Sequence, residues 1–374
     1  SNTAIGFQTL KAQNAGADAY NVAVGHQAGL LVSDGVRNTI IGALAGDALT
    51  TGDYNTVLGY NALSAEDGNG RNVAIGANAL TTLNAGADAY NIAIGYDAGY
   101  AMTTGLYNTI VGGLAGDALT GGHYNVAIGY YALSSEDGHG KNVAIGTNAL
   151  LTLNAGADGY NVAVGHDAGK AVSTGTLNTI VGGLAGDAIT TGAGNTLVGY
   201  AAGGGLTIGN SNIGIGVNAL LVSVDGDYNT AIGNNALVAY EGADGEGHNT
   251  AIGYNTGATL TTGQHNVFVG NYAGDGMTTG IRNVALGSFA LSAADAGNYS
   301  VAIGYAALNG QDGSSAGSNF YNVGVGYNAG ASMSTGTNNV LVGGAAGDAL
   351  TTGGDNIAIG KDALSAKTTG AADI

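Results

Sequence analysis

Residues 72–95 read NVAIGANALTTLNAGADAYNIAIG, and residues 142–165 read NVAIGTNALLTLNAGADGYNVAVG, so nineteen of twenty-four positions are unchanged after seventy residues. A looser copy, NTAIGFQTLKAQNAGADAYNVAVG, occupies residues 2–25, another seventy residues earlier. Repetition at a fixed period is typical of architectures in which each unit packs mainly against its neighbours. The repeat therefore decides the fold class before any local pattern does.

The whole chain follows one repeating pattern, Asn-x-x-aliphatic-Gly. Its units begin at residues 2, 21, 38, 55, 72, 91, 108, 125, 142, 161, 178, 195, 212, 229, 249, 266, 283, 300, 322, 339 and 356. The fifth residue of all twenty-one units is Gly, and the first is Asn in all but one, where Ser300 replaces it. Most units have 17 residues, and one 19-residue unit with three 17-residue units makes the 70-residue super-repeat.

The short β-rich runs closed by Gly predict strands, because a helix needs apolar residues every three or four positions and is weakened by frequent Gly. A 17-residue unit fits one coil of a solenoid, with two strands of about five residues and two turns. Coils about 4.8 Å apart would make a rod on the order of 100 Å long. We therefore expect an all-β fold: one continuous parallel β-solenoid domain of 21 coils over residues 1–374.

Two invariant columns are expected to hold the coils in register. Stacked Asn side chains can hydrogen-bond along the axis, as in other cross-β arrangements. Gly supplies turn geometry that other residues resist. In the two best-matched copies this structural ladder consists of Asn72, Gly76, Asn91, Gly95, Asn142, Gly146, Asn161 and Gly165.

The composition is that of a chain with a core and many tight turns. The 374 residues include 71 Gly and no Pro, Cys or Trp, yet 45% are hydrophobic, unlike a flexible Gly-rich linker. Eight basic and 26 acidic residues give a net charge of −18, which argues against a nucleic-acid partner. We find no signal peptide and no apolar run long enough for a membrane span.

The two faces of each strand are both apolar. The fourth residue of every unit is Ile, Val or Leu, which predicts a core position, and the third is never polar. Because side chains alternate along a strand, the third position should face outward and be covered by another copy of the chain. The alternative is that small Ala residues, which hold twelve of these positions, tolerate exposure. The expected self-association residues are Ile40, Val57, Ile110, Ile180, Leu197, Phe268 and Leu341.

The ends of the chain suggest a second mode of assembly. Asn2 begins a coil at once, and the last coil, from Asn356, is followed only by the tail SAKTTGAADI. Solenoids normally need caps, because an open coil presents unpaired backbone groups to further strands. Head-to-tail stacking into a filament is therefore the alternative to lateral packing.

The repeats NVAIG at residues 72 and 142 and NTAIG at residues 2, 229 and 249 resemble the head repeats of YadA-like trimeric autotransporter adhesins. Similar repeats occur in phage tail-fibre proteins. The resemblance covers essentially the whole chain and implies a left-handed parallel β-roll, three chains around one axis, and attachment at a cell or virion surface. The unit here is longer than is usual in that family and carries an added TTG-type segment, as at residues 50–52.

All the longer units insert residues at one corner, where protruding loops often carry binding functions. They are either a binding edge, for a surface glycan or a cell-surface receptor, or surface decoration. The insertions lie at residues 11–20, 81–90, 151–160, 238–248 and 309–321.

Acidic turns at residues 66–70, 136–138 and 225–227 could offer oxygen ligands to Ca²⁺, but none matches an EF-hand loop or a calcium-binding nonapeptide. The recurring AGD triplet accompanies a bulky third residue, which packing compensation explains better than ligation.

Tyr residues form two columns, just after the Gly and just before the Asn. Such columns either stack on sugars or finish the rim of the core. The sequence therefore assigns no metal and no cofactor.

No nucleophile, base and orienting group can be assembled from the scattered six His and three Arg, so no catalytic residue is assigned. A hexapeptide-repeat acyltransferase would show aliphatic residues six positions apart, and an ice-binding solenoid would need an unbroken Thr array. Thr occupies the second position in only eight units. We expect a non-enzymatic, extracellular structural or adhesive fibre protein that forms homo-oligomers, either a trimer or a filament. Its location would be a cell surface, a virion fibre or a secreted filament.

Overall fold

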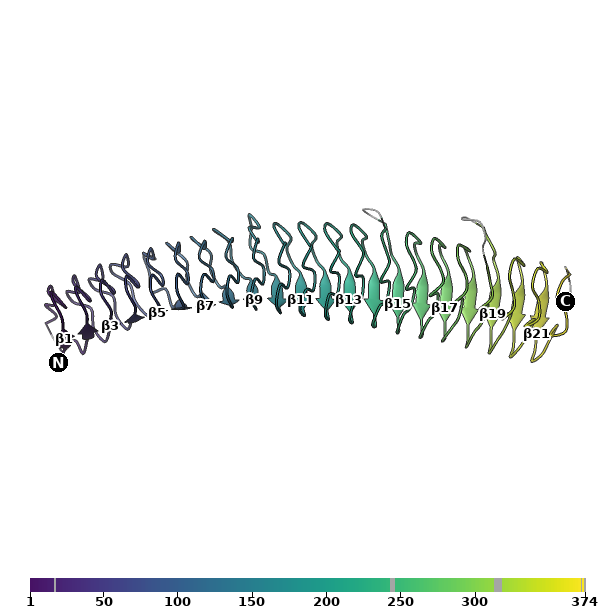
Figure 1. Ribbon diagram of the computed structural model, residues 1–374, viewed down its shortest axis with the longest axis horizontal. Helices are drawn as coiled ribbons and strands as arrows, with labels where there is room; N and C mark the ends of the chain where they lie inside the picture. The colour runs from purple at the N-terminus through teal and green to yellow at the C-terminus, as the bar shows by residue number, and fades with distance from the viewer. Residues whose placement is uncertain (17, 243–245, 313–317, 371, 373–374) are drawn as a thin grey trace. The chain divides into compact units, whose positions relative to one another are not determined.

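The computed structural model describes residues 1–370 apart from 17, 243–245 and 313–317, together with residue 372. These residues form twenty-one parallel β-strands and no helix, as a stack of coils with a repeat of about 17 residues (Figure 1). The predicted all-β parallel solenoid is therefore confirmed. The chain divides into two compact units, Ser1–Gly183 and Leu184–Ile374, so a single continuous domain remains a prediction.

The N-terminal unit contains eleven strands, each paired in register with the next one along the chain. Third positions lie beside third positions throughout, for example Ala74 beside Ala93. The strands are β1 Thr3–Ile5, β2 Val22–Val24, β3 Thr39–Ile41, β4 Thr56–Leu58, β5 Val73–Ile75, β6 Ile92–Ile94, β7 Thr109–Val111, β8 Val126–Ile128, β9 Val143–Ile145, β10 Val162–Val164 and β11 Thr179–Val181.

The C-terminal unit repeats this arrangement with ten strands in the same parallel register. Much of its core is one cluster of buried residues that runs from Ala219 to Ala358. The strands are β12 Thr196–Val198, β13 Ile213–Ile215, β14 Thr230–Ile232, β15 Thr250–Ile252, β16 Val267–Val269, β17 Val284–Leu286, β18 Val301–Ile303, β19 Val323–Val325, β20 Val340–Val342 and β21 Ile357–Ile359.

Each coil holds one strand of three residues, so the prediction of two five-residue strands per coil was wrong. The rest of the coil consists of turns. In the coil after β5, Asn78, Leu80 and Tyr90 have φ values of 58°, 52° and 52°, in the left-handed region. Left-handed residues recur at these places along the chain and break an extended backbone, so a second strand cannot form.

The Gly column is required twice over. Gly76 has a φ of 131°, a backbone region that essentially only Gly adopts. A Cβ placed on Gly76 would lie 2.2 Å from the carbonyl oxygen of Gly95 in the next coil, and one on Gly146 would lie 2.3 Å from that of Gly165. Close stacking of the coils and the turn after each strand therefore both exclude a side chain.

The Asn column forms the predicted ladder. The backbone N–H groups of Asn91 and Asn161 each donate to the Oδ1 of the preceding ladder residue, Asn72 and Asn142, at 3.1 Å. The side-chain amide of Asn91 also donates to the Gly105 carbonyl at 2.7 Å, in the following corner. All four Asn side chains are fully buried, so each coil is tied to its neighbours by a satisfied amide.

The one exception to the Asn column shows how the ladder is kept. Ser300 is too short to span the gap, and buried Gln311 supplies the missing amide. Its Nε2 donates to the Ser300 hydroxyl at 2.8 Å, and its Oε1 accepts a hydrogen bond from Asn322 at 3.1 Å. An amide from the same coil thus replaces the one that the Asn-to-Ser change removes.

The inward and outward sides of the strands are the reverse of the prediction. Third-position side chains are buried in the chain's own core, whereas second and fourth positions face outward. The residues expected to make lateral contacts therefore cannot do so. All of them are fully buried: Ile40, Val57, Ile110, Ile180, Leu197, Phe268 and Leu341.

The physical reason is that the coil is narrow. In the coil from Asn72 the core is filled by Ala74, Ala79, Leu80 and Leu83, all fully buried. The third position can therefore hold a small residue, because the Leu at the ninth position reaches in from the opposite wall. The fourth position always holds a large aliphatic residue, which is why the sequence predicted it, wrongly, to be the core position.

Bulky third residues are accommodated by Gly at the ninth position. A Cβ on Gly116 would lie 3.3 Å from Cδ1 of Ile110, and one on Gly274 would lie 2.9 Å from the ring of Phe268. This Gly is the middle residue of the AGD triplet. The packing compensation inferred from the sequence is therefore visible in the core.

Candidate functional site

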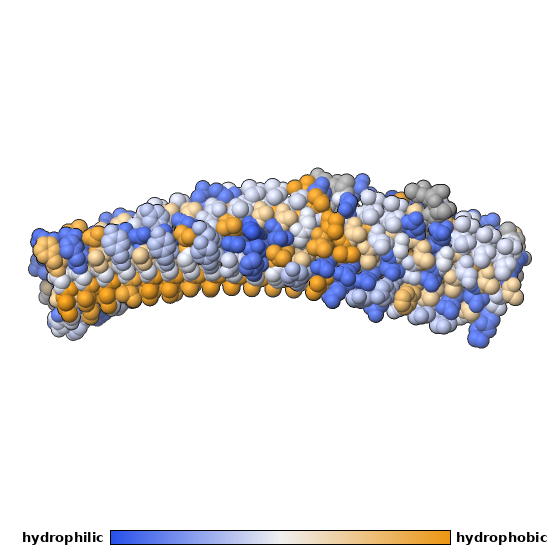
Figure 2. Space-filling view, viewed as in Figure 1, coloured by the Kyte–Doolittle hydropathy of each residue, from blue (hydrophilic) through white to orange (hydrophobic). Residues whose placement is uncertain are grey.

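The second and fourth side chains of each strand form a continuous surface, which we call the outer strand face. In the N-terminal unit it is apolar and appears as the orange band along the lower edge in Figure 2. Leu58 is 45% exposed and Ile92 is 38% exposed, although coils above and below shield each side chain. Nothing within the described part of the unit covers this face. It is a flat row of aliphatic and Thr side chains along the sheet.

Aromatic and cationic side chains line one border of the outer strand face in the N-terminal unit, just before most of the Asn residues of the ladder. Arg71 lies between two rings, 5.6 Å from the Tyr54 centroid and 5.4 Å from the Tyr90 centroid. Tyr107 stacks on Tyr90 at 5.6 Å and on Tyr124 at 5.1 Å. Because neighbours already occupy these ring faces, the column holds the edge of the stack together and leaves mainly ring edges outward.

The insertions lie at one corner of the coils, as predicted. Two of them, at residues 81–90 and 151–160, pack against the acidic turn of the preceding coil. Asp88, in the insertion at residues 81–90, pairs with Arg71 and accepts a hydrogen bond from the Gly70 N–H at 3.1 Å. Asp158, in the insertion at residues 151–160, pairs with Lys141 at 2.6 Å. The insertions at residues 11–20, 238–248 and 309–321 lie partly outside the described residues.

The Lys141 ammonium lowers the pKa of the Asp158 carboxyl, and the carboxylate in turn raises the pKa of Lys141. Both groups are exposed, so solvent screening leaves this pair with little effect on stability. The two insertions therefore serve first to cover the acidic turns beneath them.

In the acidic turn between β4 and β5, the buried carboxylate has hydrogen-bond donors for both of its oxygens. Glu66 is completely buried, and its Oε1 accepts hydrogen bonds from the backbone and side-chain N–H groups of Asn69, both at 3.1 Å. Its Oε2 accepts one from the Ala85 N–H at 3.3 Å, in the insertion above. Burial raises the pKa of Glu66, and these hydrogen bonds oppose the rise. The buried Glu66 therefore has no oxygen left to bind an ion.

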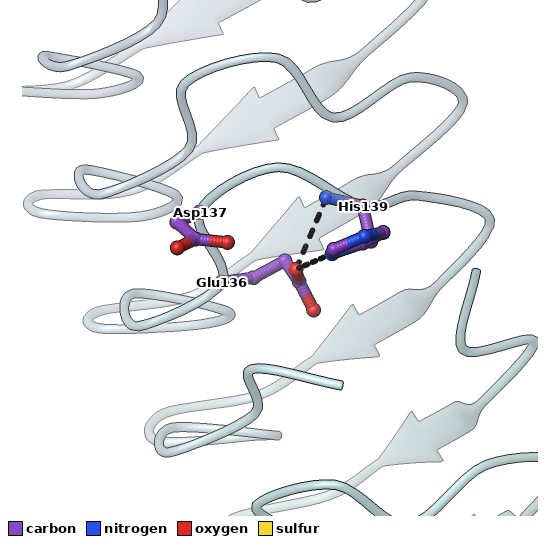
Figure 3. A group of neighbouring side chains, drawn as sticks. All are labelled: Glu136, Asp137 and His139. Atoms are coloured by element: carbon purple, nitrogen blue, oxygen red, sulfur yellow. Dashed lines mark hydrogen bonds and ion pairs between the residues drawn. The ribbon is translucent and has the colours of Figure 1, made fainter. Parts of the chain in front are cut away.

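The equivalent turn between β8 and β9 differs because His139 replaces the Asn (Figure 3). Glu136 is completely buried, and its Oε1 accepts only the His139 N–H, at 3.2 Å. The His139 Nδ1 lies 3.6 Å from that oxygen, beyond hydrogen-bonding distance. Neither Nδ1 nor the Glu136 Oε2 has a hydrogen-bond partner among the described residues. Ligand atoms of these two residues and Asp137 all lie within 4.8 Å of one another.

Burial also raises the pKa of Glu136. The nearby N–H groups of His139 and Ala155 oppose this rise, and only the His139 N–H forms a hydrogen bond to the carboxylate. The acidic turn expected from the sequence at residues 136–138 did not include His139, one residue further along. The signal was present in the 70-residue repeat, where Asn69 and His139 occupy matching positions.

The third acidic turn is used within the chain. Asp227 Oδ1 accepts a hydrogen bond from the Asn210 N–H, and Asp225 Oδ1 accepts one from the Thr207 hydroxyl at 3.1 Å. The AGD carboxylates lie four or five coils apart along the chain, and burial raises the pKa of Asp47, Asp117 and Asp275. Isolated from one another, they do not converge on a shared ligand.

No protein-family model matches the chain, and no curated protein matches it. Among the described residues there is no helical segment with the length and hydropathy of a membrane span.

Proposed function

We propose that this protein is a non-enzymatic, extracellular structural or adhesive fibre protein whose solenoids associate side by side through the outer strand face. The observation that carries the proposal is the uncovered row of aliphatic side chains at the second and fourth strand positions. A contiguous apolar surface of this size on a sheet marks an association surface or an aggregation hazard. A second copy of the same face is the partner that matches it in length and spacing.

The dimensions support a stable contact. Eleven strands about 4.8 Å apart, each about 10 Å long, give a face of roughly 500 Å² for the N-terminal unit. Two such faces bury roughly 1,000 Å² in total, which is about the lower bound for a specific interface. One unit therefore offers about the smallest area that a specific dimer needs, and additional surface is required for a trimer.

Charge favours this face over the others. The chain carries a net charge of −18, so like-charged surfaces repel when two copies meet. The second and fourth strand positions hold no charged residue in any of the twenty-one units. The copies can therefore approach closely only where the repulsion is weakest, which is along the strands.

The resemblance to YadA-like heads and tail-fibre repeats supports a place at a cell surface, on a virion or in a secreted filament. In this proposal the strand face serves assembly, and the insertion corners are offered to a glycan or a receptor. Corner loops suit this role because they protrude from the coils and vary in length.

Electron microscopy of the purified protein tests the proposal. We expect particles with two or three chains side by side, and a variant carrying Leu58→Asp and Ile92→Asp should give single chains with the coil repeat retained. A matched variant carries Asn84→Asp and Asn154→Asp, at exposed positions in the insertion corners, and should assemble like the wild type. Single chains in the wild type would refute lateral association, and long end-to-end particles in both variants would favour the filament alternative.

A further inference from the structure

The corner between β8 and β9 contains a buried carboxylate that the fold leaves incompletely satisfied. In the matching corner between β4 and β5, both oxygens of Glu66 accept hydrogen bonds, two of them from Asn69. Glu136 is equally buried but lacks a partner for Oε2. A buried carboxylate oxygen without a partner is costly, so the difference between the corners calls for a compensating group.

The imidazole that replaces the amide is placed as a ligand. Its Nδ1 points toward Glu136, at 3.6 Å from Oε1, and makes no hydrogen bond. A cation bonded to both atoms at about 2.0–2.2 Å in tetrahedral geometry holds them about 3.3–3.6 Å apart. Nδ1 and the Glu136 carboxylate therefore need almost no movement to share a metal ion, and an ion on this carboxylate also lies close to the unpartnered Oε2.

A third ligand comes from Asp137, whose side chain is exposed beside the other two. Its backbone carbonyl accepts hydrogen bonds from the Thr120 N–H and hydroxyl, which hold the turn in place. Within the described part of the chain, no other group of three His or acidic side chains brings its ligand atoms within 4.8 Å. An exposed carboxylate can rotate to close the site once an ion is present.

We propose that Glu136, Asp137 and His139 bind a divalent transition-metal ion of the Zn²⁺ type, with water completing the coordination. One imidazole nitrogen with two carboxylates suits Zn²⁺ and its neighbours, whereas Ca²⁺ takes oxygen ligands. The ion closes the turn at residues 136–139, next to the residues that the insertion at 151–160 contacts. It is independent of lateral association, since the corner lies off the outer strand face.

Titration calorimetry with Zn²⁺ on the metal-stripped full chain tests the site. We expect one Zn²⁺ per chain, and His139→Asn should weaken binding at least about tenfold, because it restores the self-satisfied corner of Asn69. His166→Asn is the control, since this exposed histidine lies in a different corner and its loss should leave binding unchanged. Circular dichroism without metal checks that each variant is folded.

The converse variant makes the test independent of any loss of folding. Asn69→His copies the second corner into the first, and the number of bound Zn²⁺ ions should rise from one to two. Equal binding by the wild type and His139→Asn would overturn the proposal, and so would a stoichiometry that stays at one in Asn69→His. Saturation by Ca²⁺ at the same concentrations, unaffected by His139→Asn, would also overturn it.

Discussion

The two sides of each three-residue strand follow different rules, although both are apolar. The inner side ranges from Ala74 to Ile110 and Phe268, and each Ile, Leu or Phe on it is matched by a Gly across the core. The outer side keeps aliphatic or Thr side chains of nearly constant size. Residue size therefore varies in the core and is compensated by the residue opposite, because a closed interior must keep its total volume. Uniformity marks a surface that must stay flat.

The largest effect is expected from a charge on the inner side. Ile110→Asp would bury a carboxylate with no partner in a fully enclosed core and should cost more than about 4 kcal/mol of unfolding free energy. Ile92→Asp, on the outer side of the neighbouring strand, should cost about 1 kcal/mol. Chemical denaturation followed by circular dichroism measures both, and equal losses would mean that the two sides are not distinct.

The turn that reverses the chain after each strand comes next. Gly95→Ala places a methyl group 2.3 Å from the Gly112 carbonyl oxygen at a φ of 143°, and should cost about 3–5 kcal/mol. Gly113→Ala is the control, because its Cβ would meet nothing closer than 3.6 Å. Thermal unfolding should show a large fall for the first variant and little change for the second. A tolerated Gly95→Ala would contradict the stacking distance between the coils.

Core compensation predicts a rescue. Ile110→Ala leaves a cavity and should cost about 3 kcal/mol, and adding Gly116→Leu should recover part of that loss by recreating the Ala74 and Leu80 arrangement. Leu80 already adopts a φ of 52°, so the backbone at Gly116, with a φ of 52°, accepts a Leu. A double-mutant cycle measures the coupling. Strictly additive losses would show that the two positions do not share the same space.

A smaller loss is expected from the ladder. Asn142→Ala removes the acceptor of the Asn161 N–H and should cost about 2 kcal/mol, whereas exposed Asn154→Ala should be nearly neutral. Amide hydrogen exchange at Asn161 should accelerate in the first variant alone. Unchanged protection at that amide would argue that the ladder contributes nothing to the coil.

The sequence predicted what the columns alone determine, namely the period, the parallel stack, the Asn ladder and the Gly turns. It failed for features that depend on contacts between residues far apart in the sequence pattern. Ile75 looks more like a core residue than Ala74 until Leu80 is seen to fill the space opposite. His139 carried no signal within its own turn, because its meaning depends on buried Glu136 and on comparison with Asn69. Both failures concern contacts between residues that no local pattern places together.

Sedimentation velocity of the wild type beside the Leu58→Asp and Ile92→Asp double variant tests most directly whether the outer strand face is an association surface. At micromolar concentration we predict an oligomer for the wild type and a monomer for the variant, with the circular dichroism of the two unchanged. A wild-type monomer, or a variant that assembles as fully as the wild type, would contradict the account.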